Sequence, residues 1–297
     1  MAVAVVAVVA AAGPFRPADL PAETKWWAHL DVERFNATEV GRSILDTTRT
    51  EKAERKLTAF REVFGFDPRT DIEGITVAGA GRRSAVIVRG RFDAKRLVTL
   101  IRAGDGYEER VVAGRTIHSW IDEKKARKEG ADKARVFGAH HPSGALVISE
   151  HETVVARVLA VMDGQEPALA AAVHGLPTAA VVVAAMDGET AATAKNPLLE
   201  SARRGVLSAR EEEGKVVADL EVEFGDASVA EKVGQILLGI QAAALLGVEK
   251  EPAAAKLASS ARVRVEGALV SLALKVPAAD IVAEIRRAAE KKKDADR

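Results

Sequence analysis

Cysteine is absent from the 297 residues of this chain, and aromatic residues make up only 4% of it. The lack of cysteine excludes disulfides, thiolate metal sites, cysteine nucleophiles and an acylated lipoprotein anchor. Net charge is lacking too, because Lys and Arg number 43 and Asp and Glu also number 43. Nucleic-acid partners favour a basic surplus, so we expect no nucleic-acid partner.

Apolar residues are plentiful, at 48% of the chain, and charged residues make up 29%. This balance is typical of a globular protein rather than a disordered one. A chain of this length buries about 75% of the surface of its unfolded state, enough for one large domain or two ordinary ones.

The chain begins with an Ala/Val run at residues 2–12 that ends in three alanines. Such a run with small residues before a cleavage point is typical of a signal peptide, although no Lys or Arg precedes it. It is too short to span a bilayer, which needs ~20 residues. We expect residues 1–12 to be a signal peptide, residues 13–19 a linker, and the protein to be periplasmic or extracellular, with no transmembrane anchor in the mature chain. A start further upstream, or a buried strand at 2–12, is the alternative.

A repeat runs through the chain. The segment from Leu20 aligns without a gap with the segment from Leu176, an offset of 156, and this alignment matches Asp31 with Asp187. The sequence Gly-Ala-Leu-Val at 144–147 also recurs further along, at an offset of 123. We infer an internal duplication of one unit.

The fold class follows from these two related units, residues 20–165 (first unit) and 176–293 (second unit). Strands joined mainly by hairpins predict an α+β fold with antiparallel sheets and helices packed on one face. The sequence leaves open whether the units share one sheet or form two domains.

Alternation and β-branched runs predict the strands, and apolar periodicity between capping residues predicts the helices. The expected strands are 26–31, 73–79, 84–92, 107–120, 134–140, 144–149, 179–186, 205–212, 215–224, 260–266 and 268–275. The expected helices are 38–48, 51–64, 93–103, 151–163, 194–203, 227–246 and 278–293.

Two segments interrupt this pattern. Residues 122–133 are charged and lack an apolar face, which predicts a solvated loop. Residues 239–260 extend a helix with many Ala and Leu residues. We expect an ordinary buried helix there, and the alternative is a surface that packs on another copy in a homodimer.

The segment "KWWAHLDVERF" concentrates chemically versatile side chains in one predicted strand. Alternation puts Trp27, His29 and Asp31 on one face. The repeat places valine and Ala185 at the positions of Trp27 and His29, which favours a core strand over an active site. Asp31 suits an Asx turn or a helix cap. Trp27 and His29 remain candidates for contact with a ligand or a partner.

Motifs for catalysis or phosphate binding are not apparent. The chain has no Gly-x-Ser-x-Gly elbow, and "HPSGA" (141–145) is typical of a hairpin turn. "AGAGRR" (78–83) lacks the Gly-Lys-Ser/Thr ending and precedes a strand, so it also predicts a hairpin. "FGFDPRTDIEGI" (64–75) predicts a structural junction in which Arg69 pairs with Asp71. We expect no cofactor.

The weak candidates for metal binding are His140, His141 and His151, with Glu150 beside them. Imidazole and carboxylate groups suit zinc only if they converge on one point. Adjacent His140 and His141 point to opposite faces of a strand, and Glu150 and His151 lie roughly 16 Å away along it. We therefore do not expect a metal site.

Three stretches carry a resemblance to a known family: "LPAETKWWAHLDVERFNATEVGRSIL", "FGFDPRTDIEGITVAG", and "VIVRGRFDAKRL" followed by "GRTIHSW". They resemble a family of uncharacterised exported bacterial proteins, in which a signal peptide precedes a similar Leu-Pro-Ala segment and a His-x-Asp strand. The resemblance covers most of residues 20–165. It implies export and fold, and it carries no assigned chemistry.

We expect a non-enzymatic binding or scaffolding protein of the bacterial envelope, with an unknown envelope protein or a small apolar molecule as partner. One alternative is a hydrolase or metal-dependent enzyme, which convergent buried polar groups would favour. Another is a carrier, which a dry apolar cavity would favour. A flat exposed patch around residues 239–260 would favour assembly.

Overall fold

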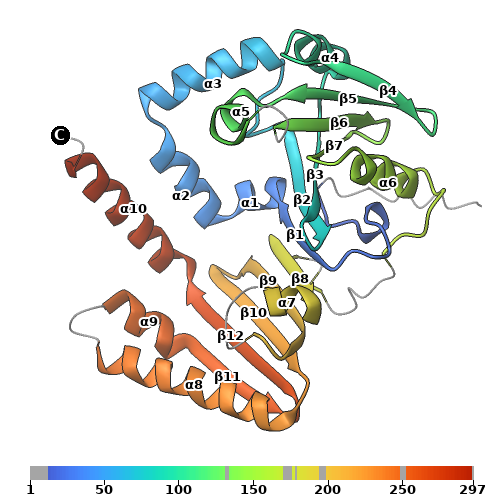
Figure 1. Cartoon of the computed structure of the whole chain (residues 1–297). Coiled ribbons are helices and arrows are strands. Elements are labelled where there is room, and N and C mark those ends of the chain that lie inside the picture. The colour runs from blue at the N-terminus through green and yellow to red at the C-terminus, as the bar shows by residue number, and fades with distance from the viewer. Residues whose placement is uncertain are drawn as a thin grey trace, which may run out of the picture.

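One antiparallel sheet of twelve strands runs through the described part of the chain (Figure 1). The computed structural model describes residues 13–130, 134–169, 176–177, 179–193, 199–247 and 252–295. The strand order is β11-β12-β10-β9-β8-β1-β2-β3-β7-β6-β5-β4. The expected α+β fold with antiparallel pairing is confirmed.

The strands of the first unit are β1 (Trp26–Asp31), β2 (Ile72–Ala80), β3 (Arg83–Gly90), β4 (Glu108–Val112), β5 (Arg115–Ile121), β6 (Arg135–His141) and β7 (Ala145–Ser149). Those of the second unit are β8 (Val182–Asp187), β9 (Ala202–Glu212), β10 (Lys215–Phe224), β11 (Ala261–Glu266) and β12 (Leu269–Pro277). The helices are η1 (Pro17–Asp19), α1 (Val32–Ala37), α2 (Glu39–Thr48), α3 (Glu51–Phe64), α4 (Ala94–Arg102), α5 (Glu123–Glu129), α6 (Glu152–Met162), α7 (Gly188–Thr193), α8 (Ala227–Leu246), α9 (Pro252–Ser260) and α10 (Ala278–Ala295).

The two units meet where β1 pairs with β8, so they share one continuous sheet. Ala28 lies opposite Ala184 in this pair, and these two residues are separated by the repeat offset of 156. Outward from that point the order is β1-β2-β3-β7-β6 in one direction and β8-β9-β10-β12-β11 in the other. The strands β4 and β5 extend only the first unit.

Each unit has its main core on one face of the sheet, and the two cores lie on opposite faces. In the first unit, α6 packs on the face that carries Trp27, Ile87 and Val147. In the second unit, α8 packs over Val222 and Val270. Strand registers followed from β1 through β8, β9, β10 and β12 place those two valines on the face opposite Trp27.

Side-chain caps begin the helices that follow the two central strands. Asp31 Oδ1 accepts a hydrogen bond from the Arg34 amide at 2.9 Å and begins α1. Asp187 Oδ1 accepts one from the Thr190 amide at 3.0 Å and begins α7. The expectation that Asp31 caps a helix is confirmed, and its counterpart in the repeat plays the same part.

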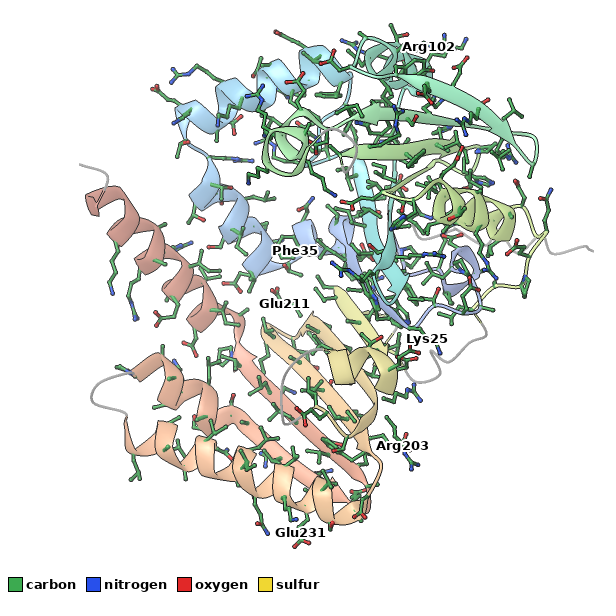
Figure 2. All side chains as sticks on the ribbon, viewed as in Figure 1. Lys25, Phe35, Arg102, Arg203, Glu211 and Glu231 are labelled. Carbon is green, nitrogen blue, oxygen red and sulfur yellow. The ribbon has the colours of Figure 1, made fainter. Side chains whose placement is uncertain are left out.

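A contact between the units satisfies the start of α2. Glu211 lies near the end of β9 and is labelled in Figure 2. It accepts hydrogen bonds from the amides of Glu39 (2.7 Å) and Val40 (3.2 Å). Thr38 Oγ1 accepts the next one, from Gly41 at 2.8 Å. The free amides of the first turn of α2 thus all have acceptors. From the second unit, α10 also packs against α2 (Figure 1).

Several expected elements differ from the structure. The expected strand 107–120 is a hairpin of β4 and β5, turning at Ala113 and Gly114, both with positive φ. The expected loop 122–133 contains α5, because Asp122 caps it through the amides of Lys124 and Lys125. In the expected helix 194–203, residues 202–203 belong to β9, and 194–198 lie outside the described residues.

Replacing Phe224, which is 1% exposed in the core of the second unit, tests this assignment. We expect Phe224→Ala to reduce the free energy of unfolding by about 3–5 kcal/mol, through lost apolar burial and a cavity. Val63→Ala, on an exposed position of α3, is the control and should change it by less than about 0.5 kcal/mol. Urea unfolding followed by circular dichroism measures both, and equal effects would contradict the assigned core.

Candidate functional site

The chain's own N-terminal segment covers the strand residues that the sequence singles out. His29 is 5% exposed, and its Nε2 lies 2.8 Å from the Gly13 carbonyl oxygen. Its Nδ1 lies 2.8 Å from Thr76 Oγ1 on β2. The ring of Phe15 stacks on Trp27 with 4.0 Å between centroids. Trp27 and His29 therefore belong to the core, as the repeat predicts, and they bind the segment expected to be a linker.

The environment of His29 favours a neutral imidazole. Burial lowers the pKa of His29, and its hydrogen bond to the Gly13 carbonyl partly opposes this effect. Since Nε2 can only donate to a carbonyl, Nδ1 accepts a hydrogen bond from the Thr76 hydroxyl in the neutral ring. Protonation of His29 would remove that acceptor.

His29→Gln should destabilise the protein by about 1–3 kcal/mol at pH 7, because buried partners lose hydrogen bonds. The unfolded chain binds a proton to His29 more readily than the folded chain does. Parent stability should therefore fall as the pH drops below about 6.5, and the variant should lose less over the same interval. Urea unfolding between pH 7.5 and pH 5 measures this, with His151→Gln as the control; identical pH profiles for parent and His29→Gln would contradict it.

The histidines considered for metal binding do not converge. Both ring nitrogens of His141 are engaged, Nδ1 with Ser143 Oγ at 2.7 Å and Nε2 with Asp163 Oδ1 at 3.1 Å. His140 follows the alternation of β6 onto the opposite face, and His151 precedes α6 at an exposed position. Among the described residues, no group of three or more metal-ligating side chains is present.

Ser143, His141 and Asp163 form a chain with the residue types of a hydrolase triad. Their surroundings suit a locked turn better. The backbone amide of Ser143 also donates to His141 Nδ1, at 3.2 Å, and Arg89 donates to Ser143 Oγ and its carbonyl oxygen, both at 3.3 Å. The carboxylate of Asp163 accepts a bidentate contact from Arg115. The imidazole thus fixes the hairpin between β6 and β7, as the "HPSGA" turn predicts.

Arg115, and secondarily His141, hold the pKa of Asp163 at about 2, well below its ordinary value. The stabilisation from this carboxylate should be complete above about pH 4 and lost as the pH falls towards 2. Asp163→Asn should lower the melting temperature at pH 5 and show a smaller drop from pH 4 to pH 2. Thermal unfolding measures this. The control is Glu166→Gln, because Glu166 is in an exposed pair with Arg157. An unchanged acid profile in Asp163→Asn would contradict the stabilising role of the Asp163 carboxylate.

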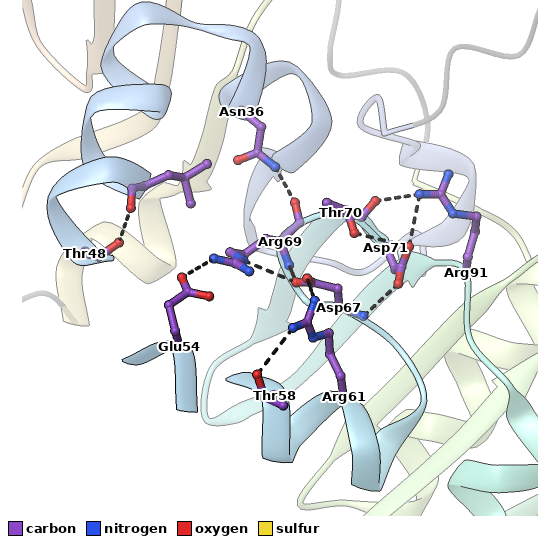
Figure 3. A network of polar contacts seen from close by, with 11 residues as sticks. Asn36, Thr48, Glu54, Thr58, Arg61, Asp67, Arg69, Thr70, Asp71 and Arg91 are labelled. Atoms are coloured by element: carbon purple, nitrogen blue, oxygen red, sulfur yellow. Dashed lines mark hydrogen bonds and ion pairs between the residues drawn. The ribbon is translucent and has the colours of Figure 1, made fainter. Parts of the chain in front are cut away.

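The junction at residues 64–75 is held by polar contacts, but not by the expected pair (Figure 3). Arg69 binds Glu54 at 2.8 Å and approaches Asp67 at 3.5 Å, whereas Asp71 pairs with Arg91 at 3.2 Å. Asp71 also accepts the Asp67 amide at 2.7 Å. The expected contact of Arg69 with Asp71 is wrong because each finds an oppositely charged partner on another element.

The C-terminal part of α8 is an uncovered apolar surface. Five large apolar side chains on it are between 42% and 87% exposed, namely Ile236, Leu238, Ile240, Leu245 and Leu246, and we call this set the α8 surface. The fully buried residues of α8 are in its first half, namely Ala230, Val233 and Gly234. In the second half one side is packed: Leu237 contacts the core, and Gln241 donates to the carbonyl oxygens of Ala258 and Ala261 at 2.7 and 2.9 Å. The expectation of an ordinary buried helix at 239–260 is therefore wrong for residues 239–247, whereas α9 buries Ala255 and Ala258; residues 248–251 lie outside the described residues. By length and composition α8 is apolar enough to cross a membrane, with 17% of its most apolar window buried.

Two grooves in the described part of the chain carry charged side chains. One, of ≈450 Å³, lies between α9 and α10 and includes Lys256 and Asp280, which pair at 2.6 Å. The other, of ≈310 Å³, lies over β8–β10 and β12 and includes Asp219, which pairs with Arg210 at 2.9 Å. Neither is the dry apolar cavity that a carrier needs.

No family model and no curated protein matches the chain. Two solved crystal forms of TP0453, a spirochete protein, resemble the fold. Form III gives a TM-score of 0.47 and 11% identity over 91% of this chain and 97% of that one. Form I gives a TM-score of 0.47 and 10% identity over 94% of this chain and 99% of that one. Similarity at this level carries no argument about function.

Proposed function

We propose that this protein is an exported, non-enzymatic scaffolding protein of the bacterial envelope that associates with a second copy of itself through the α8 surface. The observation that carries this proposal is the exposed apolar half of α8. A helix that is apolar on all sides is normally covered by protein or lipid. Residues 235–247 contain no charged side chain, yet only one side of this stretch, with Leu237 and Gln241, packs against the core and α9.

A second copy suits this surface for two reasons. A two-fold axis places a patch against itself, and an uncharged patch then meets no like charge. Gly239, Ala243 and Gly247 recur at every fourth position and so form one stripe along α8. A Cβ atom at Gly239 would meet nothing within 4 Å, which leaves room for the close approach of another helix.

A lipid surface suits α8 less well. Helices that lie on membranes carry a polar face rich in Lys and Arg, whereas α8 has Lys232 as its one basic residue and Glu231 beside it. The packing of Ala230 and Val233 in the core of the second unit also supports a mature chain without a transmembrane anchor.

Other features support the remaining parts of the proposal. The Ala/Val run and the family resemblance support export. The engaged Ser143–His141–Asp163 chain supports a structural rather than a catalytic role for these residues. The matching strand order outward from Ala28 and Ala184 supports an origin of the two units by duplication.

Sedimentation velocity over a range of concentrations tests the proposed assembly. We expect the parent to sediment as a dimer at micromolar concentration, and Leu238→Glu with Ile240→Glu to sediment as a folded monomer, because each buried charge opposes association. Val111→Glu is the matched control: Val111 is 73% exposed on β4, distant in strand order from α8, so the dimer should persist. A parent protein that stays monomeric and floats with liposomes would contradict the dimer, and it would show that lipid covers the α8 surface instead.

A further inference from the structure

The groove between α9 and α10 combines an apolar lining with charges that are already paired. Three large apolar side chains line its ≈450 Å³, namely Leu257 of α9, Val276 of β12 and Ile281 of α10. Its charged side chains form two ion pairs. Lys256 Nζ lies 2.6 Å from Asp280 Oδ1, and Arg287 Nη1 lies 2.7 Å from Glu284 Oε1. An ionic occupant would have to compete with one of these pairs, so the groove favours an apolar, uncharged one.

This groove lies next to the α8 surface. α9 packs against α8, where Gln241 donates hydrogen bonds to the carbonyl oxygens of Ala258 and Ala261. Leu257, one residue before Ala258, lines the groove and is 45% exposed. Figure 1 shows α9 between α8 and α10, with its start on the side of the second unit where α8 ends. A molecule that covers the α8 surface is therefore separated from the groove by α9 alone, a helix spacing of about 10 Å.

Leu246 is placed to bridge that distance from a second copy. It is the last residue of α8 and is 87% exposed, more than any other large apolar residue in the described part of the chain. It follows Gly239 by seven residues, which is two helical turns, so both lie on the same side of α8. On that side a Cβ atom at Gly239 would meet nothing within 4 Å. Burial of this leucine would favour association.

We propose that the groove between α9 and α10 is the docking site for the Leu246 end of α8 from a second copy. A two-fold axis matches a projection and a groove on one patch in both directions, so the contact is made twice in each dimer. Residues 235–247 carry no charge, and they leave the two ion pairs of the groove intact. This inference rests on the proposed dimer, and it adds the receiving site, which the α8 surface alone does not define.

The first test fills the groove or removes the side chain that enters it. Ala283 lines the groove and is exposed, so Ala283→Trp obstructs the groove without entering either core. Sedimentation velocity gives the dissociation constant of the dimer. We expect Ala283→Trp and Leu246→Ala each to raise it at least about tenfold, because apolar contact is lost at both sites of the dimer. Ala288→Trp, exposed on α10 outside the groove, is the matched control and should change it by less than about twofold.

Combining the two substitutions shows whether they act at one contact. The double variant should bind no more weakly than the weaker single variant, because the leucine and the groove contribute only together. Independent effects that multiply, or dissociation constants unchanged in both single variants, would overturn the docking site.

The second test locates the contact directly, because the parent chain has no cysteine. A Leu246→Cys chain is mixed with an Ala283→Cys chain under mild oxidation, and peptide mass identifies the mixed disulfide, which forms only between copies. We expect it to form at least about tenfold faster than the mixed disulfide with an Ala288→Cys chain, since a disulfide needs Cα atoms about 4.4–6.8 Å apart. Equal rates would overturn the proposal.

The outcomes separate this inference from the proposed function. A parent dimer that dissociates on Leu238→Glu with Ile240→Glu, but keeps its dissociation constant in Ala283→Trp, would leave assembly through α8 standing and overturn the groove as the docking site. A parent that stays monomeric at micromolar concentration would overturn both.

Discussion

The pairing of β1 with β8 is the constraint on which the rest of the structure depends. It joins the two units into one sheet and fixes which side chains share a face across all twelve strands. Because side chains alternate along β1, Trp27, His29 and Asp31 lie on the face of the sheet that carries the core beneath α6. The opposite face receives α8 in the second unit. One strand pair thus determines where both cores form.

The two units complete their apolar surfaces differently. In the first unit, the N-terminal segment lies over Trp27 and His29, so residues with the chemistry of a binding site are covered by the chain itself. In the second unit, α8 extends beyond the contacts of Val233 and Gly234, and the side chains of the α8 surface remain exposed. The first arrangement makes the segment of Gly13 and Phe15 part of the core. The second leaves an exposed apolar surface.

Local patterns predicted most of the strands and the caps, because alternation and short-range hydrogen bonds depend on neighbours in sequence. The gapless repeat matches Ala28 with Ala184, and these two residues lie opposite each other where β1 pairs with β8. The β4–β5 turn was missed since Ala113 adopts a positive φ that alanine disfavours. The contacts of Gly13 and the partners of Arg69 could not be predicted, because they depend on segments distant in the sequence. The exposure of α8 could not be predicted either, because composition alone does not distinguish a buried apolar helix from an exposed one.

Disulfide trapping tests the central claim, assembly through α8, most directly, because the parent chain has no cysteine. Gly239→Cys places one thiol on the stripe of α8 where a Cβ atom has free space. Under mild oxidation we predict rapid formation of a covalent dimer at low micromolar concentration, while Val111→Cys on β4 stays monomeric. Failure of Gly239→Cys to cross-link faster than Val111→Cys would contradict the account.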